Sequence, residues 1–255
     1  MKGIFDDYID KYKKIKMTSK GAIRELAKLF LNNLYGKMAA NENSSFKVPY
    51  MKDGVIAYYV VEEYEKEPGY IPVGAAITSY ARCWTIRAAQ KNYHGVDKPG
   101  FIYADTDSLH CDLPEEELID IPTHPTEFCH FKIETHWEEA IFTRQKTYIE
   151  KVVVADGKQV DPYYLIKCAG MPQKCKDVFG FALITKNGTE TEKEQVREKV
   201  TKLAQAKKLT QEQVRIIEQG KALTEFKVGL KIPGKLMPKH YPGGVLLVDT
   251  YYTMN

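Results

Sequence analysis

Two aspartates, Asp105 and Asp107, lie close together between apolar segments of the chain. In an extended strand, residues two apart point to the same side, so their carboxylates are expected to lie together. Two such charges are costly to hold together unless a cation separates them, and hard ions such as Mg²⁺ take oxygen ligands and keep substrate phosphates in their sphere. The pair therefore indicates metal-assisted phosphoryl or nucleotidyl transfer. A solvated Asp-rich turn, a calcium loop or a sugar-nucleotide transferase would present the same two residues.

A second group of functional side chains falls on one face of a helix expected from about residue 20 to 35. At about 100° per residue, the positions i, i+4, i+8 and i+11 form one stripe. Here they are Arg24, Lys28, Asn32 and Tyr35. Cations neutralise phosphates and a tyrosine ring can lie against a base or sugar, so this face could bind a nucleoside triphosphate. It could equally be a solvated face with a buried tyrosine. Four apolar residues are expected to pack inward: Leu26, Leu29, Phe30 and Leu34.

The elements that must position these residues occur in separate runs of helix and strand, which indicates an α+β fold. Helices are expected at 3–16, 20–35, 76–94 and, as a pair broken near Leu209, within 190–219. Thr18 and Ser19 should cap the second helix and Gly36 should end it. Strands are expected at 48–50 and 55–61 around an Asp53-Gly54 turn, at 101–111 around a polar turn, at 140–154, at 160–168 and after Gly244.

The net charge of +3 conceals a strong polarity along the sequence. Residues 1–40 carry +5, residues 41–166 carry −9 and residues 167–255 carry +7. Two basic ends around an acidic centre suggest a polyanion held on both sides of a carboxylate site. An ordinary solvated surface would give the same count.

Composition predicts a cytoplasmic protein. No run approaches the ~18 apolar residues of a membrane span, and the first residues lack the apolar run of a signal peptide. The five cysteines form no CxxC pair, so reduced thiols are expected. The neighbours His110-Cys111 and Cys129-His130 leave a metal site as a minor alternative.

Three ordered motifs resemble those of family B DNA polymerases. They are the fingers-helix motif KxxxNxxYG at 28–36, the palm motif YxDTDS at 103–108 and the KxY motif at 146–148. Further segments are similar to the protein-primed phage branch: 22–28, 47–50, 144–149, 167–171 and 242–245. The resemblance covers nearly the whole chain and corresponds to the C-terminal half of such an enzyme, with fingers, palm and thumb.

The resemblance implies DNA-directed DNA polymerase activity and a role for each matched residue. Lys28, with Arg24, would contact the incoming dNTP, while Asn32 and Tyr35 would line the nascent base pair. Two Mg²⁺ ions would be served by Asp105 and Asp107, with Asp107 the more direct ligand. The DNA-binding residues would be Arg144, Lys146 and Tyr148, which would steady the primer strand.

The same resemblance implies a division of the chain. Residues 1–40 would be fingers helices, 41–72 a hairpin insertion resembling the second terminal-protein region, 73–166 the palm, and 167–255 the thumb. The hairpin would encircle template, and the thumb would hold duplex through phosphate contacts. A helical insertion at about 178–223 is longer than the family pattern predicts. It could extend the thumb or dock a partner.

One departure affects activity. The family's upstream DxxSLYP motif, whose aspartate completes the metal site, is missing, as is the exonuclease domain. The chain is therefore expected to act as a fragment or subunit that needs an N-terminal polymerase half, with primer–template DNA, dNTPs and a terminal protein as further partners. The alternative is a non-catalytic DNA-binding clamp derived from such a polymerase.

Overall fold

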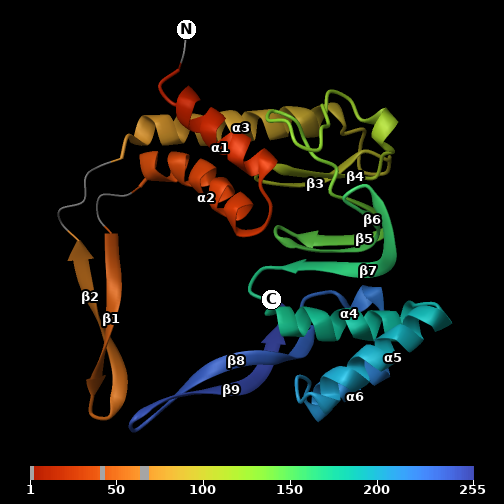
Figure 1. Cartoon of the computed structure of the whole chain (residues 1–255). Helices are drawn as coiled ribbons and strands as arrows, with labels where there is room; N and C mark the ends of the chain where they lie inside the picture. The colour runs from red at the N-terminus through yellow and green to blue at the C-terminus, as the bar shows by residue number, and fades with distance from the viewer. Residues whose placement is uncertain (1–2, 41–43, 64–68) are drawn as a thin grey trace. The chain divides into compact units, whose positions relative to one another are not determined.

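The computed structural model describes residues 3–40, 44–63 and 69–255 (Figure 1). The chain forms two compact units, which we call unit 1 (Met1–Tyr50 with Tyr58–Lys132) and unit 2 (Met51–Ala57 with Ile133–Asn255). The fold is a mixture of helices and small antiparallel sheets, as the sequence predicted. Within the described ranges, no helix combines the length and apolarity needed to cross a bilayer.

Unit 1 contains three helices and one short hairpin, together with most of a longer hairpin described below. Its elements are α1 (Asp6–Thr18), α2 (Gly21–Met38), α3 (Ile71–Lys91), β3 (Phe101–Asp105), β4 (Ser108–Cys111) and the 3-10 turn η1 (Glu115–Glu117). Helix α1 packs on α2 through aromatic rings: Tyr12 stacks on Phe30 with centroids 4.7 Å apart, and the Tyr8 hydroxyl donates to the Phe30 carbonyl at 3.0 Å. The end of α2 meets α3 at Gly74, where a Cβ would lie 2.6 Å from that of Ala39, so only glycine permits this approach.

A buried asparagine closes unit 1 beyond α3. Asn92 is fully buried, and its Nδ2 donates to the carbonyls of Ala88 at 2.8 Å and Ile119 at 3.0 Å. Its Oδ1 accepts from the Ile119 amide at 2.9 Å, and its carbonyl accepts from the Phe101 amide at 2.7 Å. One residue therefore fixes three segments: its side chain holds the end of α3 and the loop after β4, and its backbone carbonyl holds the start of β3.

The hairpin β1 (Ser44–Lys52) and β2 (Val55–Glu63) has the turn that the sequence predicted. Asp53 and Gly54 have φ of 51° and 74°, which are the left-handed conformations of a two-residue hairpin loop. At this tip the Gly54 carbonyl accepts a hydrogen bond from the Gly243 amide at 2.5 Å. Residues 41–43 and 64–68 of the expected 41–72 insertion lie outside the described residues.

Unit 2 contains a three-stranded sheet, three helices and a long hairpin. The elements are β5 (Thr135–Arg144), β6 (Thr147–Ala155), β7 (Lys158–Cys168), α4 (Gln173–Asn187), α5 (Glu190–Gln205), α6 (Gln211–Gln219), the 3-10 turn η2 (Leu223–Glu225), β8 (Lys231–Tyr241) and β9 (Gly244–Thr253). The sheet has the order β5-β6-β7 with every pairing antiparallel, and β8 pairs only with β9 in the described chain.

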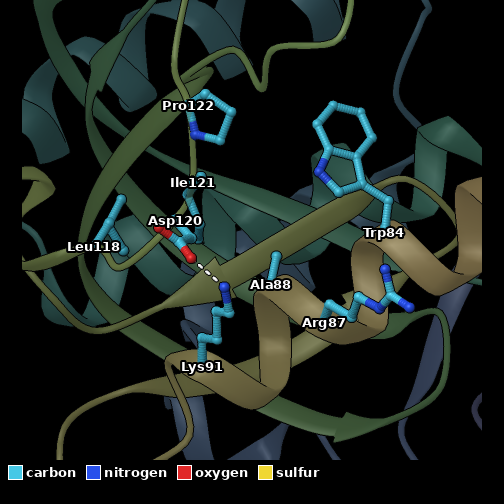
Figure 2. Close-up of a pocket in the computed structure, with 8 residues that line it drawn as sticks. All are labelled: Trp84, Arg87, Ala88, Lys91, Leu118, Asp120, Ile121 and Pro122. Carbon is cyan, nitrogen blue, oxygen red and sulfur yellow. Dashed lines mark hydrogen bonds and ion pairs between the residues drawn. The ribbon is translucent and has the colours of Figure 1, made fainter.

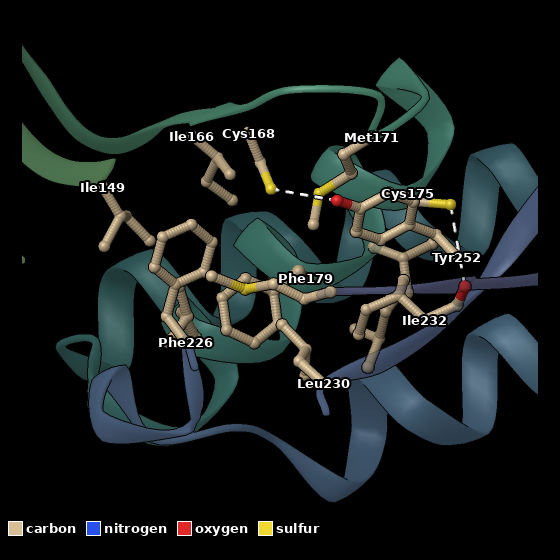
Figure 3. Close-up of a cluster of buried hydrophobic side chains, with 14 of the residues drawn as sticks. Ile149, Ile166, Cys168, Met171, Cys175, Phe179, Phe226, Leu230, Ile232 and Tyr252 are labelled. Carbon is tan, nitrogen blue, oxygen red and sulfur yellow. Dashed lines mark hydrogen bonds between the residues drawn. The ribbon is translucent and has the colours of Figure 1, made fainter. Parts of the chain in front are cut away.

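One hydrophobic core unites these elements (Figure 3). Phe179 of α4 is fully buried and stacks on Phe226 with centroids 5.8 Å apart. The cluster also takes Ile149 from β6, Val196 from α5 and Ile217 from α6. The helices expected as an insertion at about 178–223 are thus packed into the same core as the strands, rather than appended to it.

Several predicted boundaries were wrong for local reasons. Helix α2 has Lys20 as its N-cap without a side-chain cap, because Thr18 instead donates to the Lys14 carbonyl at 2.9 Å. Gly36 lacks a positive φ, so it does not end the helix. The expected strand 140–154 is interrupted by a turn at Lys146, whose φ is 57°. Strand β8 was not predicted at all, because its prolines and glycine are typical of breaks, but a two-stranded sheet tolerates proline.

Candidate functional site

The two aspartates occupy a tight turn in unit 1. Asp105 ends β3 and pairs with Ser108 of β4, while Thr106 has a φ of 57°. The strand alternation used to align the carboxylates therefore does not apply at Asp107, because the chain has already turned. The turn is closed by the Asp107 amide, which donates to the Asp105 carbonyl at 2.7 Å, and by the Ser108 hydroxyl, which donates to the same carbonyl at 3.1 Å.

Helix α3 supports this turn through one buried hydroxyl. Thr85 Oγ1 lies 3.2 Å from the Thr106 carbonyl and 3.1 Å from the Ala81 carbonyl of its own helix. Because Thr85 is only 6% exposed, the Thr106 carbonyl is held by a buried hydroxyl of α3 rather than by solvent. The carboxylate of Asp105 accepts from the Thr106 hydroxyl at 3.0 Å, while Asp107 is exposed. The turn thus presents a half-buried carboxylate, Asp105, and an exposed one, Asp107, and Thr85 of α3 holds it from the buried side.

The two carboxylates of this turn are the right type of ligand for a hard divalent cation, but they are too few to hold it alone. Carboxylate oxygens are the ligands that Mg²⁺ prefers. Within the described part of the chain, no group of three or more His, Cys, Asp or Glu residues that could hold a metal ion is found. Asp105 and Asp107 could therefore contribute to a metal site, but a further ligand is needed to complete it.

The stripe predicted on α2 is present on a solvated surface. Arg24, Lys28, Asn32 and Tyr35 are all exposed, and the Arg24 guanidinium pairs with the Glu25 carboxylate at 3.2 Å. Tyr35 is not buried, which removes the interpretation of this face as the cover of a core. Two cations, an amide and a ring are therefore available to a ligand.

A third cation joins this group from α1. The pKa of the Lys16 ammonium is lowered, first by burial and then by the positive charges of Arg24 and Lys28. Its Nζ also lies 5.4 Å from the centre of the Phe128 ring. A positive charge that two neighbouring cations disfavour in this way would be stabilised by a bound anion. Sequence reasoning missed Lys16 because it belongs to a run of lysines that resembled a solvated face.

The apolar face of α2 is exposed, although the sequence predicted that it packs inward. Leu26, Leu29 and Phe30 were predicted to pack inward, but each is exposed, and the buried residue of the helix is Ala27. The small Ala27 side chain covers little area. Helix α2 therefore contributes little to a core within unit 1.

The predicted DNA-binding residues lie in unit 2, at the turn between β5 and β6. Arg144 and Lys146 are exposed, and Lys146 takes the left-handed conformation while its carbonyl accepts from the Ala169 amide at 3.1 Å. Tyr148 stacks on Phe142 with centroids 5.3 Å apart. The turn thus presents two cations beside an aromatic pair formed across β5 and β6. On β6 the residue after Tyr148, Ile149, is buried in the core.

The segment after β7 supports that turn from behind. The Tyr252 hydroxyl donates to the Ala169 carbonyl at 3.2 Å and contacts Cys168 Sγ at 3.2 Å (Figure 3). Burial and then Cys168 raise the pKa of Tyr252 to about 12. The Lys-Cys-Ala-Gly-Met segment at 167–171 therefore joins the β5–β6 turn to β9.

Unit 1 also contains a cavity of about 610 Å³ between α3 and the chain after η1 (Figure 2). Trp84, Arg87 and Lys91 line it from one face of α3, and Lys91 pairs with Asp120 across it. The residues recorded along its walls include none of the site residues predicted from the sequence. The Thr85 side of α3 serves the aspartate turn, so the helix has two separate polar faces.

Comparison with known proteins gives consistent matches. Residues 1–125 match the family described as DNA polymerase type B, organellar and viral. The DNA polymerase of Bacillus phage phi29 is 36% identical over 268 residues, covering 99% of this chain. That of Streptococcus phage Cp-1 is 37% identical over 180 residues, covering 70% of this chain. The chain spans about 38% and 30% of the length of these two relatives.

A solved structure agrees with the sequence relatives. The phi29 DNA polymerase complexed with primer-template DNA and incoming nucleotide substrates matches with a TM-score of 0.71 and 33% identity. The match covers 100% of this chain and 38% of that chain.

Proposed function

This chain belongs to the type B DNA polymerases, and from that premise we propose that it carries the nucleotide-binding and part of the metal-binding machinery of a DNA-directed DNA polymerase. The reaction joins the primer 3′-oxygen to the α-phosphorus of a dNTP and releases pyrophosphate. The single observation that carries the proposal is the conjunction, in unit 1, of an aspartate turn held by the buried Thr85 with a three-cation group, Lys16, Arg24 and Lys28, on helices α1 and α2.

The side chains of unit 1 have different roles according to their charge. Lys16, Arg24 and Lys28 hold the triphosphate and neutralise its negative charge. Asn32 and Tyr35, farther along the same face, contact the base pair being formed. Asp105 and Asp107 would supply ligands to Mg²⁺, which when bound would favour ionisation of the primer hydroxyl and stabilise the leaving phosphates. Thr85 keeps the turn between the two carboxylates in place.

The basic side chains of unit 2 bind DNA. Arg144 and Lys146 contact phosphates of the primer strand, and Tyr148 presents its ring beside them. The β1–β2 hairpin and the β8–β9 hairpin contact template and duplex through sequence-independent interactions that weaken with salt. The phi29 structure that this chain resembles holds primer-template DNA and nucleotides, which supports these assignments.

A second polypeptide segment completes the enzyme. The third metal-binding carboxylate is supplied by the N-terminal half found in family members, either on another chain or elsewhere in the protein. Large apolar side chains exposed on α2, α3 and β3 support this inference, because such surface normally marks an interaction site. They include Leu29, Phe30, Ile77, Tyr80, Ile86 and Ile102. The assembled enzyme would use a terminal protein as primer and act in the host cytoplasm.

The test is extension of a labelled primer–template by the purified chain with Mg²⁺ and dNTPs, alone and with a matching exonuclease–palm fragment. We expect extension only with the added fragment. Asp107→Asn should reduce it at least ~10³-fold, because one metal ligand loses its charge. The matched control is Asp97→Asn, at an exposed loop position of the same unit, which should leave extension unchanged.

Three other results would count against the proposal. Full activity in Asp107→Asn would remove the aspartate from the metal site. Equal losses in Asp97→Asn would indicate a general effect of charge. No extension under any condition, with DNA binding that falls steeply as salt rises and does not depend on Mg²⁺, would establish a non-catalytic DNA-binding clamp.

A further inference from the structure

The β8–β9 hairpin leaves the core of unit 2 at a single point. Ile232, Pro233 and Gly234 of β8 are buried, and every residue from Lys235 to the end of the strand is exposed. On the returning strand, Tyr252 is buried and Tyr251 is exposed. We call residues 235–250, none of which is buried, the arm. Its strands pair only with each other in the described chain, and at its tip the Gly243 amide donates to the Gly54 carbonyl of the β1–β2 turn at 2.5 Å. Its direction is therefore set where it leaves the core and by this one contact at the tip.

A β-bulge stands at this exit. The register shifts between Pro233 and Lys235, and Gly234 has a φ of 121°. A Cβ on Gly234 would lie 2.8 Å from Nε2 of Gln213 and 3.4 Å from Sγ of Cys175. Bulges bend a strand and increase its twist, so the conformation of this residue contributes to the direction of the arm. Glycine is favoured here because its φ lies where L side chains are rarely found, and a Cβ would also displace the Gln213 amide.

Helix α6 supplies the buried contact at the bulge. Gln213 is 1% exposed, and its Nε2 donates to the Pro233 carbonyl at 3.3 Å. Its Oε1 accepts from the Thr210 amide at 2.8 Å, which is one half of the capping box that begins α6. Cys175 Sγ of α4 lies 3.6 Å from the same Pro233 carbonyl. One amide side chain therefore fixes the start of α6 and the exit of β8 together.

The neighbouring residue of α6 binds the other strand. The Tyr251 hydroxyl donates to the Glu212 carboxylate, and this bond raises the pKa of Tyr251. Consecutive residues of α6 thus hold β8 from inside the core and β9 from its surface. Figure 3 shows Tyr252 and Ile232, which anchor the same strand ends in the core. Apolar packing fixes these ends in place, and the directional hydrogen bonds fix the angle at which the strands leave.

We propose that α6 holds the β8–β9 arm at a fixed angle to unit 2, and that Gln213 is the positioning residue through which it does so. The arm carries Lys235 and Lys239, whose positive charges suit the phosphates of duplex DNA. Holding the arm in one orientation keeps these groups aligned with the duplex and slows its release. This consequence rests on the proposed function, whereas the positioning itself does not.

The sharpest variant is Gln213→Glu. A glutamate keeps the oxygen that accepts from Thr210, so the capping box survives, but as a carboxylate it cannot donate to the Pro233 carbonyl. The matched control is Gln219→Glu, which adds the same charge to an exposed position of the same helix. Hydrogen–deuterium exchange of amides in residues 235–250 measures how firmly the arm is held, without any need for polymerase activity.

We expect exchange in the arm to become about tenfold faster in Gln213→Glu, because about one buried hydrogen bond is lost. Exchange in β5–β7 and the control variant should match the unsubstituted chain. Dissociation of a fluorescent duplex from the variant should become faster by a similar factor. Unchanged exchange in the arm would overturn the proposal, and so would equal acceleration throughout unit 2, which would indicate general destabilisation. An unsubstituted chain that binds no duplex would instead refute the proposed function, and the exchange result would still decide the positioning.

Discussion

Unit 1 and unit 2 place their apolar side chains in opposite ways. In unit 2, large residues such as Phe179, Phe226 and Ile232 are almost fully buried in one continuous core. In the described part of unit 1, the buried apolar residues are the small ones Ala27, Ala88 and Ala89, while Phe30 and Tyr80 are exposed. Yet unit 1 holds the aspartate turn and the three-cation group. The part with most of the proposed chemistry is the part with the least hydrophobic core.

The two units are therefore stabilised by different kinds of interaction. Burial of apolar surface stabilises unit 2, at about 25 cal/mol per Å². Unit 1 depends more on directional polar contacts, such as those of Asn92 and Thr85, and on aromatic contacts between α1 and α2. We infer that unit 2 is stable by itself, whereas unit 1 gains stability when its exposed apolar side chains are covered. Each prediction below tests one side of this comparison.

The largest effect is expected from Phe179→Ala. Removing a fully buried ring should lower the free energy of unfolding of unit 2 by about 3–5 kcal/mol, since it removes apolar contacts and leaves a cavity. The two tryptophans make the units separable, because Trp84 lies in unit 1 and Trp137 in unit 2. In a Trp84→Phe background, urea denaturation followed by fluorescence reports on unit 2 alone.

The same denaturation in a Trp137→Phe background reports on unit 1, whose midpoint should not move with Phe179→Ala. The control substitution is Leu246→Ala, at a position that is 60% exposed, which should cost less than about 0.5 kcal/mol. A common shift of both midpoints would show that the units unfold together, and the comparison between them would no longer apply to stability.

The next largest effect, on activity alone, is expected from Lys28→Ala. Loss of one charge-assisted contact with the triphosphate costs about 1.5–3 kcal/mol, so the KM for dNTPs should rise roughly 10- to 100-fold in the complemented enzyme. The midpoint of unit 1 should stay constant because Lys28 is exposed. Lys37→Ala, on the last turn of the same helix, is the control. An unchanged KM would remove α2 from the nucleotide site.

How much of this could be predicted from the sequence differs between the units. In unit 1 the α2 stripe and the aspartate turn were found, because helical periodicity and a strand–turn–strand pattern are local signals. The prediction that Leu26 and Leu29 pack inward was wrong, because periodicity shows which face of a helix is apolar but not whether anything covers that face. Thr85 gave no signal, since a threonine in an apolar helix has many possible roles.

In unit 2 the capping box at Thr210 and Gln213 is a feature that the sequence can predict, because it depends on residues three apart. The second role of Gln213, its bond to Pro233, depends on a partner 20 positions away and could not be predicted. Strand β8 was missed because Gly234 and Pro238 are typical of breaks. Local chemistry was therefore predictable, and the long-range contacts that position it were not.

A moderate effect is expected from Thr85→Val, which keeps the shape of the side chain and removes its hydroxyl. The Thr106 carbonyl loses its bond from α3, and the aspartate turn loosens at a cost of about 1 kcal/mol. We expect the kcat of the complemented enzyme to fall about 5- to 10-fold, with the KM for dNTPs changed less than twofold. Thr78→Val, whose hydroxyl contacts only carbonyls of its own helix in the described chain, is the control. A rise in KM without a change in kcat would show that Thr85 does not act through the turn.

The smallest effect concerns the pH dependence of nucleotide binding. The pKa of Lys16 lies below the ordinary lysine value of 10.5 because burial and the charges of Arg24 and Lys28 disfavour its protonated form. As the pH rises toward 10.5, Lys16 therefore loses its charge before a lysine of ordinary pKa would, and triphosphate affinity should fall a few-fold. In the folded chain this charge is unfavourable, so the same rise in pH should slightly stabilise unit 1. Lys16→Arg keeps the charge throughout, and should move the loss of affinity to higher pH. Identical pH profiles for the two proteins, measured as KM for dNTPs, would show that Lys16 does not touch the triphosphate.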